Sequence, residues 1–534
     1  MWCKTDRGSR VSCALCVKQI KEVKIVSQKK GGVILAYISQ IVAIMTGIIY
    51  TPFMLRALGQ SEYGLYSLVS STVSVLSMLN MGFSGCYLYF YNKLSTEKDK
   101  DSVAKFNAEY FLIFCFIAVL TLICGIFVYF NLDLFFGNGL SKAEYDKAAT
   151  LTIVMVLNMA ASLPINIFSS GINASGKFIL ENGYAVFNSL VTLVLNVFVL
   201  SRGYGSIGLT VVALFMTGVK FFLFFYIGIK VIKMNFCFKN LPISLVKSML
   251  SFTIFIFFNQ ITNYLNSQLD KVLLGRFVGT SAVAVYSIGS TIYIYFQQFS
   301  NSITGVFGPQ INYINAKYIA ENNEKYGNKI LLDVFIKVSR LQFYIAFLII
   351  TGFILFGKEF ILLWAGSNYK SAYYIAIGLM LTSFVFQATG DTIQRAKFKH
   401  KIRAIVFLFM AILNVAISIP LIAAYGELGA AVGTMIVCVL GNGVFLNWYY
   451  YKKLHLDMKR YWRSIISLCK AVVFALFLGC VMVEFMVIKN WMELFMGAAI
   501  YSAVYIIICW ILAFNQEEKN IAYSFLRFIM RHSE

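Results

Sequence analysis

Polar side chains recur at helical spacing inside two long apolar stretches of this chain. The first stretch, 250–274, carries Asn259, Asn263, Asn266 and Asp270 at steps of four, three and four residues. Such steps place side chains on one face of a helix. The second stretch, 281–306, carries a similar row, formed by Tyr286, Ser290, Tyr293, Gln297 and Asn301. Amide and hydroxyl groups in these rows can donate and accept hydrogen bonds along a continuous surface.

Two interpretations of these rows stay open. Polar groups are costly in hydrocarbon, so within a membrane span they face a bundle interior or water. In the first interpretation the rows line a hydrated cavity, and the candidate binding residues are Asn259, Asn263, Asn266, Tyr293, Gln297 and Asn301. In the second, the same groups form hydrogen bonds between packed helices.

Two ionisable residues lie deep in apolar stretches. Lys220 lies near the middle of 207–232. An ammonium group at that depth is costly without a partner, so Lys220 predicts either an anion-binding site or an ion pair with a carboxylate. Asp270 is the deepest acid. It predicts a site for a coupling proton or cation, or a salt bridge to Lys271 or Arg276.

The elements that must position these residues are long apolar segments. Hydrophobic residues make up 59% of the chain, charged residues 13%, and the mean hydropathy is +0.74. This composition excludes a soluble globular protein. About fourteen segments approach the length that spans a hydrocarbon core near 30 Å thick. They are 32–55, 64–91, 108–131, 148–170, 183–201, 207–232, 250–274, 281–306, 333–357, 371–390, 402–424, 428–450, 465–487 and 491–514.

The net charge of +22 is explained by membrane topology. Most of the 46 Lys and Arg residues fall in segments on one side of the predicted spans. Cytoplasmic loops are enriched in these residues, so both termini are predicted to be cytoplasmic. Binding of nucleic acid is therefore not expected.

Motifs for metal, cofactor or catalytic chemistry are missing from the sequence. Cys13 and Cys16 form a lone pair without a second pair, and the histidines His400, His455 and His532 are dispersed. There is no phosphate-binding loop for ATP. We expect no metal, no cofactor and no enzymatic activity.

An internal repeat with an offset of about 220 residues divides the chain. Arg56 and Gly59 match Arg276 and Gly279, with similar matches of Lys177 to Lys397 and of the segment 204–208 to 425–429. Each repeat holds six spans, so both have the same orientation. The predicted fold is an all-α polytopic membrane protein with two parallel six-helix lobes and two additional C-terminal helices.

The domain limits follow from this repeat. They are a basic cytoplasmic leader at 1–31, an N-lobe at 32–232, an inter-lobe linker at 233–249, a C-lobe at 250–451, two further spans within 465–514 and a cytoplasmic tail at 515–534.

Three motifs carry a resemblance to a known family. They are the turn 58–67, the run 270–287 and the segment 360–366. The chain resembles the polysaccharide-unit flippases of the Wzx type, in the multidrug/oligosaccharidyl-lipid/polysaccharide (MOP) exporter superfamily, whose fold is MATE-like. The resemblance implies alternating-access transfer of a polyprenyl-diphosphate-linked oligosaccharide across a bacterial plasma membrane for O-antigen, capsule or exopolysaccharide synthesis. Lys220 would neutralise the diphosphate, and the polar rows would bind sugar hydroxyls.

The resemblance also implies partners and leaves alternatives. The expected partners are the lipid-linked substrate, membrane lipids, H⁺ or Na⁺ as a coupling ion at Asp270, a polysaccharide polymerase and a chain-length regulator. The alternatives are a flippase for a peptidoglycan lipid precursor, a cation-coupled multidrug antiporter and a membrane glycan polymerase. An antiporter is disfavoured because the N-lobe offers Lys220 and no equally deep acid, and a polymerase because the predicted outer loops are short.

Overall fold

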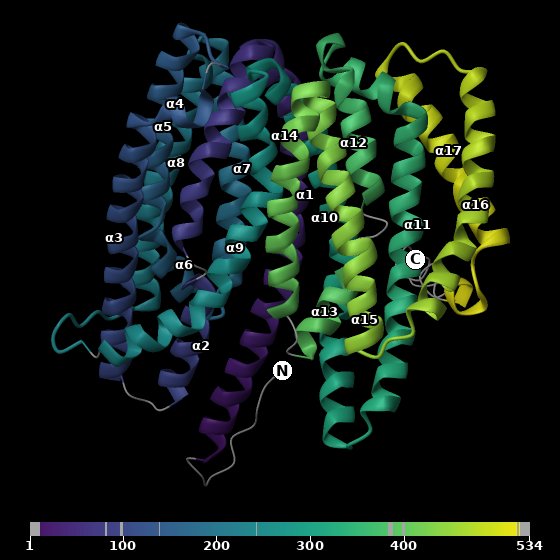
Figure 1. Ribbon diagram of the computed structural model, residues 1–534. Helices are drawn as coiled ribbons and strands as arrows, with labels where there is room; N and C mark the ends of the chain where they lie inside the picture. The colour runs from purple at the N-terminus through teal and green to yellow at the C-terminus, as the bar shows by residue number, and fades with distance from the viewer. Residues whose placement is uncertain are drawn as a thin grey trace, which may run out of the picture. The chain divides into compact units, whose positions relative to one another are not determined.

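The computed structural model describes residues 11–80, 83–96, 100–137, 139–241, 243–382, 388–397, 401–520 and 523, with some side chains in these ranges left out. Within these ranges the chain is built of helices joined by short turns, and no strand occurs (Figure 1). The predicted all-α class is therefore confirmed. Wherever the predicted spans lie in described residues, they are almost wholly helical.

Helices of the first half correspond to predicted spans one to six. They are α1 (Val11–Val73), η1 (Ser74–Asn80), α2 (Phe83–Thr96), α3 (Lys100–Phe130), α4 (Leu132–Phe136), α5 (Lys142–Ser162), α6 (Ile165–Ala174), α7 (Phe178–Ser201), α8 (Gly205–Tyr226) and η2 (Ile227–Ile232). Because α1 begins at Val11, it includes much of the segment predicted as a leader.

The second half corresponds to spans seven to fourteen. Its helices are α9 (Ile243–Phe277), α10 (Thr280–Ala320), α11 (Glu324–Trp364), η3 (Ser367–Tyr369), α12 (Ser371–Thr382), α13 (Ala388–Ala396), α14 (Lys401–Cys438), η4 (Val439–Phe445), α15 (Leu446–Lys453), α16 (Met458–Glu484) and α17 (Trp491–Leu512). By length and composition, nine stretches of the described residues can cross a membrane, and two of these, Leu35–Asn80 and Ile405–Lys453, each contain residues of two predicted spans.

Glycines at positive φ mark the same turns in both halves. Gly59 breaks α1 with φ 75° and ψ 172°, and Gly279 separates α9 from α10 with φ 118° and ψ 179°. Gly205 at φ 61° begins α8, and Gly426 at φ 56° kinks α14. Side chains disfavour these conformations, so glycine is needed at each turn. Span six ends in the π-helix η2, and span twelve contains the π-helix η4 before α15. The sequence repeat is therefore a repeat of backbone conformation.

The chain divides into two compact units. The first unit comprises residues 1–135 and 141–264, and the second comprises residues 136–140 and 265–534. The division falls within α9, after Tyr264. The domain limits given by the sequence repeat stay predictions.

A charged cluster joins three helices of the first unit. Glu62 in α1 contacts Lys147 in α5, with 2.7 Å between Oε2 and Nζ. Its Oε1 accepts hydrogen bonds from the backbone N–H and the hydroxyl of Ser206, both at 2.8 Å. A carboxylate is stabilising at the free N–H groups of a helix N-terminus. A Cβ on Gly205 would lie 2.4 Å from Glu62 Oε1, so the contact also requires glycine there.

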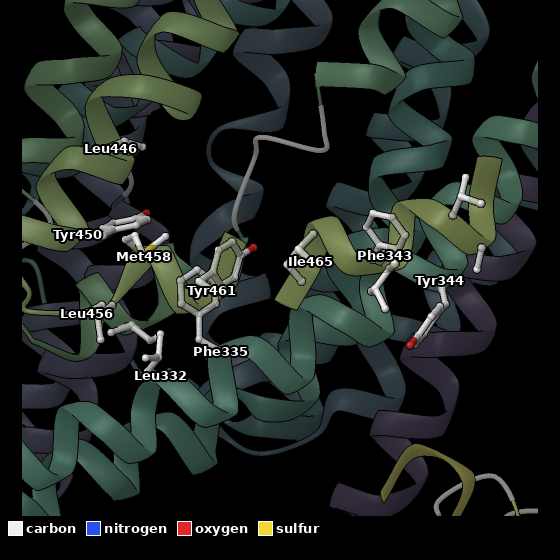
Figure 2. Packing of buried hydrophobic residues seen from close by; sticks show 14 of the residues in the cluster. Leu332, Phe335, Phe343, Tyr344, Leu446, Tyr450, Leu456, Met458, Tyr461 and Ile465 are labelled. Atoms are coloured by element: carbon white, nitrogen blue, oxygen red, sulfur yellow. The ribbon is translucent and has the colours of Figure 1, made fainter. Parts of the chain in front are cut away.

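The second unit has an apolar core between α11, α15 and α16 (Figure 2). The rings of Phe335 and Tyr461 have centroids 4.4 Å apart. Leu332, Tyr450 and Met458 lie beside them. Since α17 also packs on α11, the two helices after the repeat are attached to the second unit.

A buried ion pair ties α11 to the residues after α17. Arg340 Nε lies 2.6 Å from Glu518 Oε1, with the two side chains 10% and 4% exposed. Tyr344 also donates to Glu518, at 3.0 Å. Burial raises the pKa of Glu518, but hydrogen bonds from Arg340, the Asn515 backbone and Tyr344 outweigh it and hold that pKa below its ordinary value.

Glu518→Gln should lower the free energy of unfolding by about 3–5 kcal/mol, because it leaves the Arg340 guanidinium buried without a counter-charge. Thermal unfolding of the purified protein in detergent measures the change. Glu517→Gln is the matched control, since its side chain is 79% exposed and its Lys337 partner is 3.8 Å away. The control should change stability by less than about 0.5 kcal/mol.

The pH dependence of this difference has a defined sign. Because the pKa of Glu518 is lowered in the folded state, its stabilising contribution is present above the ordinary glutamate pKa, about 4.3. It is lost as the pH falls through the lowered value. A difference between wild type and Glu518→Gln that grows toward low pH would contradict the account.

Candidate functional site

A polar cavity of about 820 Å³ lies within the first unit. Its walls come from η1, α5, α6, α7 and α8, and Figure 1 shows α5 and α8 in the same bundle as α3. Most of its polar groups are amides and hydroxyls, from Asn80, Asn158, Asn166, Asn182, Asn188, Ser77, Ser162, Ser189, Thr192 and Thr217. Among the lining residues that the structure describes, Glu181 is the one acid and Lys220 the one base.

Lys220 projects from α8 and has partners on two helices. Its Nζ lies 3.7 Å from Glu181 Oε1 on α7. The same ammonium lies over two rings, 5.7 Å from the centroid of Tyr184 and 5.0 Å from that of Phe224. The side chain is 33% exposed although it lies midway along a predicted span. The exposure is explained by the cavity, which gives the ammonium access to a solute.

Three oxygen atoms in the cavity lining are buried and accept no hydrogen bond from the described residues. They are Glu181 Oε2, Asn80 Oδ1 and Thr192 Oγ1. Elsewhere in the lining, Thr217 donates to Asn158 at 2.6 Å, and Asn182 donates to the Gly32 carbonyl at 3.0 Å. Buried polar atoms usually have partners, including water. The three oxygens are therefore unused acceptors in the wall of the cavity, below its accessible surface.

A second polar cluster surrounds Asp270 in the second unit. Tyr286 on α10 and Thr434 on α14 both donate to Asp270 Oδ2, each at 2.6 Å. Thr434 accepts from Asn414 Nδ2 at 3.2 Å, and Ser418 donates to Asn414 Oδ1 at 2.5 Å. Asp270 Oδ1 is buried without a hydrogen-bond partner in the described structure. A carboxyl group with one unpaired oxygen, next to the hydroxyl groups of Tyr286 and Thr434, has the chemistry of a site for a proton or a small cation.

The structure describes the side chains of only some residues in the predicted polar rows. Gln297 donates to the Tyr293 hydroxyl at 2.6 Å, one turn away on the same helix. Ser290 is buried and donates to the Ser287 carbonyl at 3.1 Å. The side chains of four further predicted residues lie outside the described residues: Asn259, Asn263, Asn266 and Asn301. Their role in lining a cavity stays a prediction.

Several residues of both clusters were missed from the sequence. Glu181 is the principal case, because the sequence suggested no acid as deep as Lys220 in the N-lobe, and the structure places one beside it. The one sequence signal for this pair was that spans five and six are consecutive and are therefore expected to pack antiparallel. Asn414 and Ser418 are one turn apart in an apolar span, and that polar spacing could have found them.

Solved transporters share this fold over most of the chain. The Lipid II flippase MurJ in its inward closed conformation matches with a TM-score of 0.66 and 16% identity, over 89% of this chain and 98% of that chain. An outward-facing multidrug resistance MATE family transporter of the MOP superfamily matches with a TM-score of 0.53 and 16% identity, over 80% and 97% of the two chains. None of the curated proteins matches the sequence.

These likenesses define the class of protein as a multi-pass membrane protein with the MurJ and MATE fold, which confirms the predicted architecture. The chain belongs to the family of polysaccharide biosynthesis proteins, whose model matches residues 30–314, more than half of the sequence. This assignment does not extend to the Wzx-type specificity that the sequence motifs imply.

Thr434→Val should destabilise the second unit by about 1–3 kcal/mol, because it removes one donor to the buried Asp270 carboxylate and the acceptor of Asn414. Thr434→Ser retains the hydroxyl and should stay close to wild type. Thermal unfolding of the three proteins compares them. Equal losses in both variants would assign the effect to packing of the Thr434 methyl group instead.

Proposed function

We propose that this protein is a flippase that moves polyprenyl-diphosphate-linked oligosaccharide repeat units across the bacterial plasma membrane by alternating access. The observation that carries the proposal is the polar cavity of the first unit, in which Lys220, 3.7 Å from Glu181, stands among amides and hydroxyls. Family membership supports a role in polysaccharide biosynthesis. In this proposal both termini are cytoplasmic, and a polymerase and a chain-length regulator act on the product.

The chemistry of the substrate matches the chemistry of the cavity. The diphosphate is an anion, and a cation that is partly removed from bulk water, as Lys220 is, attracts it more strongly than a fully exposed cation does. Sugar hydroxyls exchange hydrogen bonds with amide and hydroxyl groups of the kind that line the cavity, such as those of Asn188 and Ser189. A cavity of about 820 Å³ lies in the upper range for small-molecule pockets, about 300–1,000 Å³. It therefore fits a headgroup rather than a whole lipid-linked glycan.

The polar rows of α9 and α10 are also proposed to bind sugar hydroxyls. This role is assigned to Asn259, Asn263, Asn266, Tyr293, Gln297 and Asn301, in addition to Lys220 for the diphosphate. Tyr293 and Gln297 already exchange one hydrogen bond, so a bound sugar would compete with or share that bond. Asp270 is proposed to carry the coupling ion, H⁺ or Na⁺, at its unpaired Oδ1.

A flippase for a peptidoglycan lipid precursor is the second candidate. The observation that favours it is the TM-score of 0.66 with the Lipid II flippase. Both candidate substrates present a diphosphate to Lys220, so they differ in the sugars. Transport assays with the two lipids side by side separate the candidates.

The proposal is tested with purified protein in proteoliposomes. A lipid-linked oligosaccharide is placed in both leaflets, and its exposure to an impermeant sugar-modifying reagent is followed with time. We expect protein-dependent exposure of the inner-leaflet lipid. Export of organic cations without any movement of the lipid would instead support a multidrug antiporter, and polymer formation would support a polymerase.

Lys220→Ala should slow flipping at least about tenfold, since a hydrogen bond to a charged group contributes roughly 1.5–3 kcal/mol and 1.4 kcal/mol is a factor of ten. Lys220→Arg keeps the positive charge and should retain most of the rate. Flipping rates in the proteoliposome assay measure both. Equal rates in the wild type and both variants would exclude Lys220 from substrate binding.

Asp270→Asn should abolish the dependence of flipping on a Na⁺ or pH gradient, because the amide retains hydrogen bonding and loses the charge that binds the ion. The measurement is the ratio of flipping rates with and without each gradient. Glu484→Gln is the control, since Glu484 is an exposed acid at the end of α16. A gradient response that survives in Asp270→Asn would place ion coupling elsewhere.

A further inference from the structure

The ion pair between Lys220 and Glu181 differs from the structural ion pair of the second unit. Its Nζ and Oε1 atoms are 3.7 Å apart, and the two side chains are 33% and 25% exposed. Arg340 and Glu518 are 2.6 Å apart and 10% and 4% exposed. A hydrogen bond between an ammonium and a carboxylate is ordinarily about 2.7–2.9 Å long. Lys220 and Glu181 therefore attract each other electrostatically but form no hydrogen bond. Because both side chains are partly exposed, a competing anion has access to the pair.

Lys220 has contacts that do not depend on Glu181. The Tyr184 and Phe224 rings lie within 6 Å of the ammonium, at the distance of a cation–π interaction. Tyr184 is itself fixed, because its hydroxyl donates to the Met216 carbonyl at 3.1 Å. These rings keep the ammonium in the cavity when its counter-charge changes.

Glu181 is likewise anchored without Lys220. Ser169 on α6 donates to Glu181 Oε1 at 2.8 Å, and this is the same oxygen that faces Lys220. Glu181 Oε2 is buried and has no hydrogen-bond partner in the described structure. The carboxylate therefore stays at the cavity wall whether or not Lys220 is bound to something else, and it repels any anion that approaches the ammonium.

We propose that Glu181 is the exchangeable counter-ion of Lys220 and sets how readily the cavity releases an anionic ligand. When the cavity is empty, Glu181 balances the ammonium. When the diphosphate of the substrate arrives, Lys220 turns to the phosphate oxygens, and Glu181 remains close by as a fixed negative charge. After transfer, Glu181 regains the ammonium and the anion leaves. This inference rests on the proposed function, and it adds a residue that makes binding reversible.

A transporter must release the ligand that it binds. A cation in a partly desolvated cavity attracts a diphosphate strongly, and a site that binds too tightly does not turn over. A carboxylate that pairs with the cation in the empty cavity lowers the net affinity for an anion, because the anion must replace an attraction that already exists. Removing that carboxylate should therefore strengthen binding and slow release.

Binding of inorganic pyrophosphate to the purified full-length protein tests the inference by isothermal titration calorimetry in detergent. We expect Glu181→Gln to bind pyrophosphate about tenfold more tightly than wild type, within the usual range of coupling between two sites. Lys220→Met should abolish binding. In the double variant, Glu181→Gln should bring no gain, because the competition is for Lys220.

A control variant and a second readout separate this role from a structural one. Glu517→Gln makes the same carboxylate-to-amide change at an exposed residue outside the cavity lining and should leave pyrophosphate binding unchanged. Thermal unfolding confirms that each variant is folded. In proteoliposomes Glu181→Gln should flip the lipid-linked substrate more slowly than wild type although it binds pyrophosphate more tightly.

Unchanged or weaker pyrophosphate binding in Glu181→Gln would overturn the inference and leave Glu181 as a structural partner of Lys220. Lack of binding in both wild type and Glu181→Gln would overturn it as well. Wild-type flipping of the lipid-linked oligosaccharide is measured in the same preparations. If flipping persists in either case, the proposed function stands and only the role of Glu181 fails.

Discussion

The cost of removing a charge from water governs this molecule. An ammonium in the middle of a membrane span is tolerated only with a counter-charge, with aromatic rings or in a hydrated space. Lys220 has all three, through Glu181, the rings of Tyr184 and Phe224, and the cavity of the first unit. The helices that form the cavity therefore also supply the groups that stabilise the charge of Lys220.

The same constraint is met differently in the second unit. Arg340 and Glu518 satisfy each other at short range and leave little exposed surface, so they connect elements of the structure. Asp270 has hydroxyl donors on one oxygen and no partner in the described structure on the other. A charged group whose hydrogen-bonding atoms are all paired is suited to stabilising the fold. A charged group with an unpaired atom next to polar groups can still bind a ligand or an ion. This distinction supports the assignment of Lys220 and Asp270 to function.

Much of the fold was predictable because it depends on local rules. Apolar segment length predicted the spans, and the repeat at an offset of 220 residues predicted that Gly59 and Gly279 occupy equivalent turns, as their positive φ angles confirm. The interruption of span four between Ser162 and Ile165 and the π-helices η2 and η4 were not predicted. Such irregularities depend on how neighbouring helices pack, which hydropathy does not report.

The sites were predicted less completely for a related reason. Depth in a span pointed to Lys220 and Asp270, since a single helix determines depth. Their partners come from other helices, and the rotation and tilt that bring Glu181 to Lys220, or Thr434 to Asp270, are set by tertiary packing. The periodicity of a single helix does not reveal this rotation and tilt relative to its neighbours. The central claim is that the first-unit cavity holds an anionic headgroup at Lys220. A structure of the protein with a bound prenyl-diphosphate-linked sugar tests it most directly. We expect phosphate oxygens at hydrogen-bond distance from Lys220 Nζ, and a diphosphate bound outside this cavity would refute the proposed site.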